Sequence, residues 1–318
     1  MAIKNNVKPD TVLKTFWKNN QRFADLFNTV LFEGNPILKP NDLKEVDTDV
    51  SSIIKFNNHA DTVQRILDVV RKTAYGIDFI IWSLENQENI HYAMPLRHMV
   101  ADSLIYLKEY NEITTKNRNG KNFDTSDEFL SGLQKGDRLH PVISLCIYYG
   151  KEDWDGPFNL VDMLIMPEYL KPLVSDYKMK LIQVRKSEDL SFKDQDINNL
   201  FELIRSIYNK DYNSFQRMYK NKELSTELGL TLGSVVNSQR IINQVLAVKE
   251  KGSDSNMTDP FEEMLEEMKK QEGKKAKIEG TIHTCKKFHI TQEETLKNLI
   301  EEFTLSEDKA KEYIKMYW

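Results

Sequence analysis

The fold is decided by residues 65–97, RILDVVRKTAYGIDFIIWSLENQENIHYAMPLR. This stretch holds two short apolar runs, residues 66–70 and 77–84, separated by a Tyr-Gly dipeptide. Such a pattern predicts a β-hairpin. Asp68 interrupts the first run and Glu85 ends the second, although strands this apolar normally exclude carboxylates. Two acids on paired strands predict a metal site.

The spacing of the polar residues determines which of their side chains can lie on the same face of the hairpin. Glu85 and Gln87 are two residues apart, so they share one face if the strand continues through them. Asp68 must then lie on that face. Two carboxylates, water molecules and a substrate phosphate suit Mg²⁺, a hard cation that prefers oxygen ligands. Spacing alone leaves an alternative open, in which Asp68 is an edge-strand charge and Glu85 a solvated strand end.

The hairpin carries Asp68 on its first strand, Glu-x-Gln at residues 85–87 after its second strand, and YAMPLR at residues 92–97 at the start of the next helix. This combination resembles the recombination-promoting nuclease / putative transposase family, a branch of the PD-(D/E)XK nucleases. The resemblance extends over roughly residues 20–185. Further matching segments are FADLFN at 23–28, EFLSG at 128–132, PVI at 141–143 and YYG at 148–150.

The resemblance implies a fold and a domain organisation. We expect an α+β (α/β) fold with a PD-(D/E)XK restriction-endonuclease-like core, in which helices flank a mixed sheet of about four strands. A mainly helical C-terminal region follows. The expected parts are a nuclease-like domain at residues 1–190, a helical extension at 191–251, and a linker with a helical tail at 252–318.

The resemblance also implies an activity, a metal-dependent DNA endonuclease linked to DNA recombination or mobile elements. Asp68 and Glu85 would hold Mg²⁺, for which Mn²⁺ can substitute. Gln87 would orient the attacking water, and Asp25 is a candidate third ligand of the metal. The departure from the superfamily pattern is Gln87, which stands where a lysine is expected and removes a cation from the site.

The alternative function is a catalytically silent nuclease-fold protein that acts as a DNA-binding or assembly module. A net charge of −5 favours this alternative, because DNA-binding domains are usually basic. The candidate contacts to DNA phosphates near the proposed site are Arg97, Arg71 and Lys72. A homo-oligomer is left open by the sequence.

The composition predicts a cytoplasmic globular protein without a membrane segment. The 318 residues are 40% hydrophobic and 29% charged, which is ordinary for a globular chain. No apolar run approaches the roughly 20 residues that span a bilayer. The first residues lack the apolar core of a secretory signal. Two distant cysteines, Cys146 and Cys285, are read as free thiols in a reducing compartment.

Apolar periodicity and breaker residues predict the remaining elements in chain order. The expected elements are a helix over 10–33 broken near 19–20, a loop over 34–62 in which Ile53-Ile54 is a candidate strand start, a helix over 95–110, an exposed loop over 114–127, a central strand over 139–149, a strand over 179–184, and helices from 191 onward.

Overall fold

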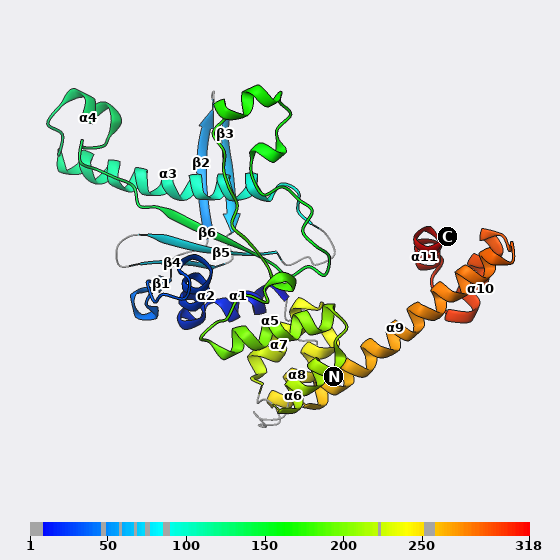
Figure 1. Ribbon diagram of the computed structural model, residues 1–318. Helices are drawn as coiled ribbons and strands as arrows, with labels where there is room; N and C mark the ends of the chain where they lie inside the picture. The colour runs from blue at the N-terminus through cyan, green and yellow to red at the C-terminus, as the bar shows by residue number, and fades with distance from the viewer. Residues whose placement is uncertain are drawn as a thin grey trace. The chain divides into compact units, whose positions relative to one another are not determined.

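The computed structural model describes residues 9–45, 49–56, 59–66, 69–73, 77–84, 90–221, 224–250 and 258–318. The chain divides into two compact units, Met1–Ser255 and Asn256–Trp318. The fold mixes helices with strands and is mostly helical, as expected from the sequence (Figure 1).

The first unit contains helices and strands, followed by a purely helical part. Its strands are β1 (Lys44–Glu45), β2 (Asp49–Phe56), β3 (His59–Ile66), β4 (Val69–Lys72), β5 (Asp78–Leu84), β6 (Val142–Tyr148) and β7 (Leu181–Gln183). Its α-helices are α1 (Pro9–Trp17), α2 (Asn20–Phe32), α3 (Met94–Gly120), α4 (Ser126–Ser131), α5 (Gln195–Tyr208), α6 (Tyr212–Asn221), α7 (Thr226–Val235) and α8 (Gln239–Glu250). Short 3₁₀ helices are η1 (Pro40–Asp42), η2 (Val161–Met163), η3 (Glu168–Leu173) and η4 (Val184–Lys186).

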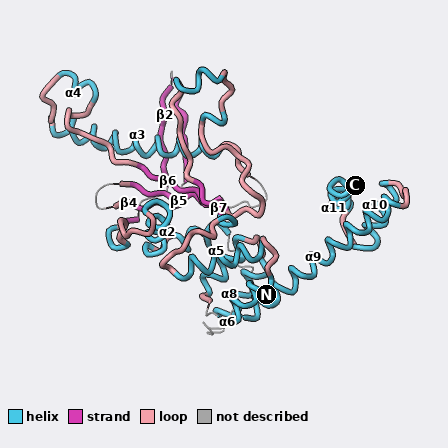
Figure 2. Tube along the Cα trace, viewed as in Figure 1, coloured by secondary structure: helices cyan, strands magenta, loops and turns pink. Residues whose placement is uncertain are grey.

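A mixed five-stranded sheet of order β1-β4-β5-β6-β7 organises this unit (Figure 2). The predicted hairpin is confirmed, because β4 and β5 pair antiparallel with Val69 opposite Ile81. Strand β6 pairs parallel with both β5 and β7. Parallel pairing of β5 with β6 requires a crossover, which α3 supplies. The predicted central strand is therefore β6, whose last five residues are buried.

Two expectations for the region before β4 are wrong. Residues 49–56 and 59–66 form a second sheet, the antiparallel pair β2–β3, where a loop was expected through residue 62 with Ile53-Ile54 as a candidate strand start. The apolar run at 66–70 is divided between two strands, because β3 ends at Ile66 and β4 begins at Val69. Strand β2 (DVSSIIKF) places like residues side by side and β3 (HADTVQRI) is mostly polar, so the alternation that would reveal a half-buried hairpin is weak.

The first helical region is broken at the predicted place. Asn19 lies between α1 and α2, and its side-chain oxygen accepts hydrogen bonds from the backbone N–H groups of Gln21 (2.9 Å) and Arg22 (3.3 Å). This N-cap satisfies donors at the start of α2. Figure 1 shows α1 and α2 on one side of the sheet and α3 on the other, and the last five residues of β6 are buried.

Helix α3 is longer than predicted, because it continues through residues expected to be a loop and ends at Gly120. Asn117 stabilises this extension. It is buried, and its side-chain amide donates to Gly132 O (3.3 Å) and to Asp137 Oδ2 (2.7 Å). Lys121 then adopts a left-handed conformation with φ of 53° and ends the helix.

The second unit consists of α9 (Thr258–Lys287), α10 (Gln292–Phe303) and α11 (Glu307–Tyr317). A capping box at Thr291 and Glu294 begins α10. The three helices share an apolar core of Ile278, Ile282, Leu299, Phe303, Ala310 and Ile314. Throughout the part of the chain that the structure describes, we find no helix with the length and apolar character needed to cross a membrane.

Candidate functional site

The candidate site lies at the end of the sheet where β4 begins and β5 ends. Val69 pairs with Ile81, and β5 continues beyond this pair to Leu84. Leu84 in turn pairs with Tyr148, the last residue of β6. The start of β4 and the carboxyl ends of β5 and β6 therefore lie at one end of the sheet.

The predicted catalytic residues flank this end in the sequence. Asp68 directly precedes Val69, and Glu85 directly follows Leu84. Asp68, Glu85 and Gln87 themselves lie outside the described residues. Their role as metal ligands and catalytic residues stays a prediction.

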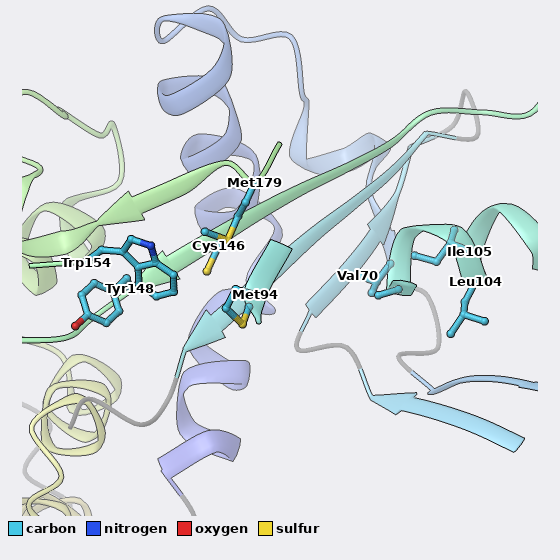
Figure 3. Close-up of a cluster of buried hydrophobic side chains, with 9 residues drawn as sticks. Val70, Met94, Leu104, Ile105, Cys146, Tyr148, Trp154 and Met179 are labelled. Atoms are coloured by element: carbon cyan, nitrogen blue, oxygen red, sulfur yellow. The ribbon is translucent and has the colours of Figure 1, made fainter. Parts of the chain in front are cut away.

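An apolar cluster supports this end of the sheet (Figure 3). Tyr148 packs edge-on against Trp154 with their ring centroids 5.2 Å apart. Trp154 is held from the neighbouring strand, because Gln183 Oε1 accepts its backbone N–H at 2.9 Å. Met94, at the start of α3, and half-buried Ile90 complete this part of the cluster. Cys146 and Met179 lie beside them in Figure 3.

Trp154 also presents a polar atom that the described residues leave unsatisfied. Its side chain is buried, and its indole Nε1 has no hydrogen-bond partner among them. A buried N–H donor without an acceptor is costly, so native proteins usually supply one. This donor suits an anionic or carbonyl oxygen.

Three acids follow β6 on the loop that carries Trp154. Burial, followed by the nearby charges of Glu152, Asp155 and Asp153, raises the pKa of the Tyr148 hydroxyl. The Tyr92 hydroxyl donates to Asp155 at 3.3 Å. Asp153 pairs with Lys186 at 3.1 Å, and with Arg185 at 3.9 Å. In the described part of the chain, no group of three or more His, Cys, Asp or Glu side chains is placed to hold a metal ion.

The predicted phosphate contacts fall in different places. Arg97 lies in the first turn of α3, half-buried, at the same end of the helix as Met94. Lys72 ends β4 and pairs with Asp78, so it lies at the opposite end of the hairpin from Val69. These positions make Arg97 the better candidate for contacting a phosphate near the site.

Arg71 is a buried residue with internal partners. Its guanidinium donates to Asn20 Oδ1 (2.8 Å), Lys18 O (2.6 Å) and Val70 O (3.0 Å). Burial lowers its pKa, which the charge of Glu45 partly opposes. The described contacts of Arg71 thus fix β4 to the region between α1 and α2.

Asp25 of α2 is buried, and its described contact is structural. Its Oδ2 atom accepts the backbone N–H of Asp194, the N-cap residue of α5, at 2.7 Å. This bond joins α2 to a helix that begins about 170 residues later in the sequence. The predicted third metal ligand therefore has one oxygen engaged in holding two helices together.

Two buried polar clusters were not predicted from the sequence. Arg22 of α2 forms ion pairs with Asp196 (2.5 Å), Glu227 (2.8 Å) and Asp194 (3.8 Å), and its guanidinium lies over the Phe16 ring. The second cluster surrounds Asp102 of α3. In the sequence, each cluster is marked only by a charged residue on an otherwise apolar helical face. Such a residue does not reveal which side chains it contacts.

Part of the chain matches a known protein family. Residues 126–228 match the model of a family described as putative transposase, YhgA-like. This match confirms the predicted family resemblance over these residues. The family belongs to the PD-(D/E)XK nuclease-like Rpn group. The match covers α4, β6, β7, α5, α6 and the start of α7, but not the β4–β5 hairpin. No curated protein and no solved structure matches the chain.

Proposed function

We propose that this protein is a Mg²⁺-dependent DNA endonuclease of the PD-(D/E)XK type, with a role in DNA recombination or mobile elements. The observation that carries the proposal is the register of β4 with β5. It brings the start of one strand and the end of the other to the same end of the sheet. Asp68 and Glu85 are the adjoining residues in the sequence.

The order of elements supports the same proposal. The family resemblance predicts a helix before an acid-bearing hairpin and a second helix after it. The chain has α2, then the β4–β5 hairpin, then α3 and the parallel strand β6. The family match over residues 126–228 continues this order from α4 onward.

The chemistry of the residues fits a hard cation. Asp68 and Glu85 supply carboxylate oxygens, which suit Mg²⁺ and also Mn²⁺. When bound, such a cation polarises a phosphate and lowers the pKa of a bound water. The Gln87 amide would orient that water or the phosphate by hydrogen bonds.

Asp25 and the basic residues take secondary roles in this proposal. Asp25 remains the candidate for a third ligand through Oδ1, since Oδ2 accepts the N–H of Asp194. Arg97, in the first turn of α3, would contact the phosphate.

A second function is favoured by two features of the sequence. Gln87 replaces the expected lysine, and the chain has a net charge of −5. Both are consistent with a silent nuclease fold that binds DNA or assembles with other proteins. Mg²⁺ binding separates the two functions, because only the enzyme needs an intact metal site.

Plasmid nicking with Mg²⁺, with Mn²⁺ and with chelator tests the proposal. We expect nicked plasmid with either cation and none with chelator. Calorimetric titration with Mg²⁺ accompanies the assay. Absence of both nicking and Mg²⁺ binding would reject the enzyme in favour of the silent fold.

A further inference from the structure

The C-terminal end of α3 and the segment after it, residues 113–138, form a separate lobe that we name the α3–α4 lobe. Figure 1 shows α4 at the end of α3, beyond the strands of the sheet. Internal hydrogen bonds close the lobe. Asn117 donates to Gly132 O at 3.3 Å, and Gln134 Nε2 donates to Asn122 O at 2.6 Å. These hydrogen bonds fix the conformation of the lobe and therefore the positions of its surface residues.

Half of the acids in the lobe are engaged by backbone hydrogen bonds. It contains four acidic residues, two of which accept backbone N–H groups within the lobe. Glu128 accepts from Asp124 N and from Lys135 N, each at 2.8 Å, and these bonds lower its pKa. Asp137 Oδ2 accepts from Gln134 N at 2.8 Å. Their negative charge is thus held against backbone donors.

The five basic side chains of the lobe are all exposed. They are Lys116, Arg118, Lys121, Lys135 and Arg138. With five basic and four acidic residues the lobe has a net charge of +1, and two of its acids accept backbone hydrogen bonds, on a chain whose net charge is −5. Local positive charge of this kind attracts phosphates even when the whole protein is acidic.

Exposed apolar side chains lie among these cations. Phe129 is 64% exposed and Leu130 is 78% exposed. The Phe129 ring is held by an edge contact with Phe123, with centroids 5.9 Å apart. Exposed apolar side chains of this kind also suit a protein–protein contact.

We propose that the α3–α4 lobe binds the phosphate backbone of duplex DNA and contributes to affinity outside the cleavage site. This inference rests on the proposed function, in which DNA is the substrate. Lysine and arginine contacts to phosphates release counterions from DNA and are independent of sequence. The lobe would therefore strengthen binding to any DNA sequence.

The test is DNA binding by the full chain with Lys116→Ala, Arg118→Ala and Lys135→Ala combined. Fluorescence anisotropy of a labelled duplex is measured against salt concentration in chelator, so that no cleavage occurs. We expect weaker binding, and a slope of log affinity against log salt that is smaller by about 0.9 for each phosphate contact removed. Circular dichroism verifies that the variant is folded.

A matched control removes the same charge elsewhere. Lys275→Ala, Lys277→Ala and Lys297→Ala change three exposed lysines of the second unit. We expect this control to keep the wild-type slope. The proposal is overturned if the lobe variant and the control bind duplex DNA equally well. It is also overturned if RNA of the same length binds more tightly through the same residues.

Self-association is measured as the competing explanation of the exposed apolar residues. Analytical ultracentrifugation compares the wild type with Phe129→Ser and Leu130→Ser combined. A smaller assembly in this variant, with unchanged DNA binding by the lysine variant, would make the lobe a protein interface and reject the proposal. None of these experiments measures cleavage. The nicking assay therefore tests the proposed nuclease activity independently of DNA binding by the lobe.

Discussion

Ser144 of β6 donates its hydroxyl to Asp102 of α3 at 2.7 Å, beneath the helix that crosses the sheet. The other carboxylate oxygen of Asp102 accepts the hydroxyl of Tyr177. Burial raises the pKa of Asp102, and the hydrogen bonds from Tyr177 and Ser144 oppose this shift only in part. The crossover between β5 and β6 therefore includes a buried acid whose pKa is raised, so that it binds its proton more tightly than an exposed aspartate does.

The raised pKa of Asp102 predicts how stability depends on pH. The folded state holds this proton more tightly than the unfolded state, whose aspartates titrate near pH 4. The free energy of unfolding should accordingly fall as pH rises from about 4 through the folded pKa. We expect Asp102→Asn to remove that decline and to be at least as stable as wild type at pH 7. Thermal melts of both proteins between pH 4 and 8 check this, and identical pH profiles would contradict it.

Removal of Arg22 should destabilise the first unit strongly. Asp194, Asp196 and Glu227 would lose their cation, and breaking a buried ion pair typically costs about 3 kcal/mol or more. Since these acids are partly exposed, we expect Arg22→Ala to lower the free energy of unfolding by about 3 kcal/mol, at the lower end of that range. Arg22→Lys, the control, should lose less because it retains the charge. Urea denaturation measures both, and a loss below about 1 kcal/mol in Arg22→Ala would count against the network.

Gly150 should not tolerate a side chain. A Cβ atom there would lie 2.0 Å from the buried ring of Tyr148, which packs against Trp154. We expect Gly150→Ala to lower the free energy of unfolding by about 1–3 kcal/mol, as for other overpacked sites. Gly136→Ala is the matched control, since a Cβ there meets nothing within 4 Å. Equal stability of the two variants would show that the ring moves aside freely.

The elements that were predictable from the sequence have strong local signals. The β4–β5 hairpin is an apolar pair of runs around Tyr75-Gly76, and β6 is an almost uninterrupted apolar run. The break between α1 and α2 was predicted near Asn19-Asn20, and Asn19 is a residue type that favours N-caps. In each case the side chains that set the conformation are neighbours in sequence.

The features that escaped prediction depend on distant residues. Helix α3 passes through polar residues because Asn117 bonds to Gly132 and Asp137, and no periodicity reveals those partners. Asp25 is a candidate metal ligand from the resemblance, and its hydrogen bond to the backbone of Asp194 was not predicted. Sequence spacing shows that a residue is polar and where it lies on its element, but not which later segment packs against it.

Gln87 gives the sharpest prediction about mechanism. If its amide orients the attacking water, Gln87→Ala should reduce the rate of cleavage by about 10²-fold through loss of a transition-state interaction. Gln87→Lys should remain active, because the longer cation can still reach the water. Single-turnover nicking rates measure both variants. An unchanged rate in Gln87→Ala would assign Gln87 a structural role.

Plasmid nicking by Asp68→Asn and Glu85→Gln, beside Asp78→Asn, tests whether Asp68 and Glu85 hold the catalytic metal. Asp78 begins β5 and pairs with Lys72, so it is an acid at the other end of the same hairpin. The proposed metal site predicts that Asp68→Asn and Glu85→Gln lose Mg²⁺-dependent nicking while remaining folded, and that Asp78→Asn cleaves like wild type. Wild-type cleavage by Asp68→Asn and Glu85→Gln combined would contradict the account.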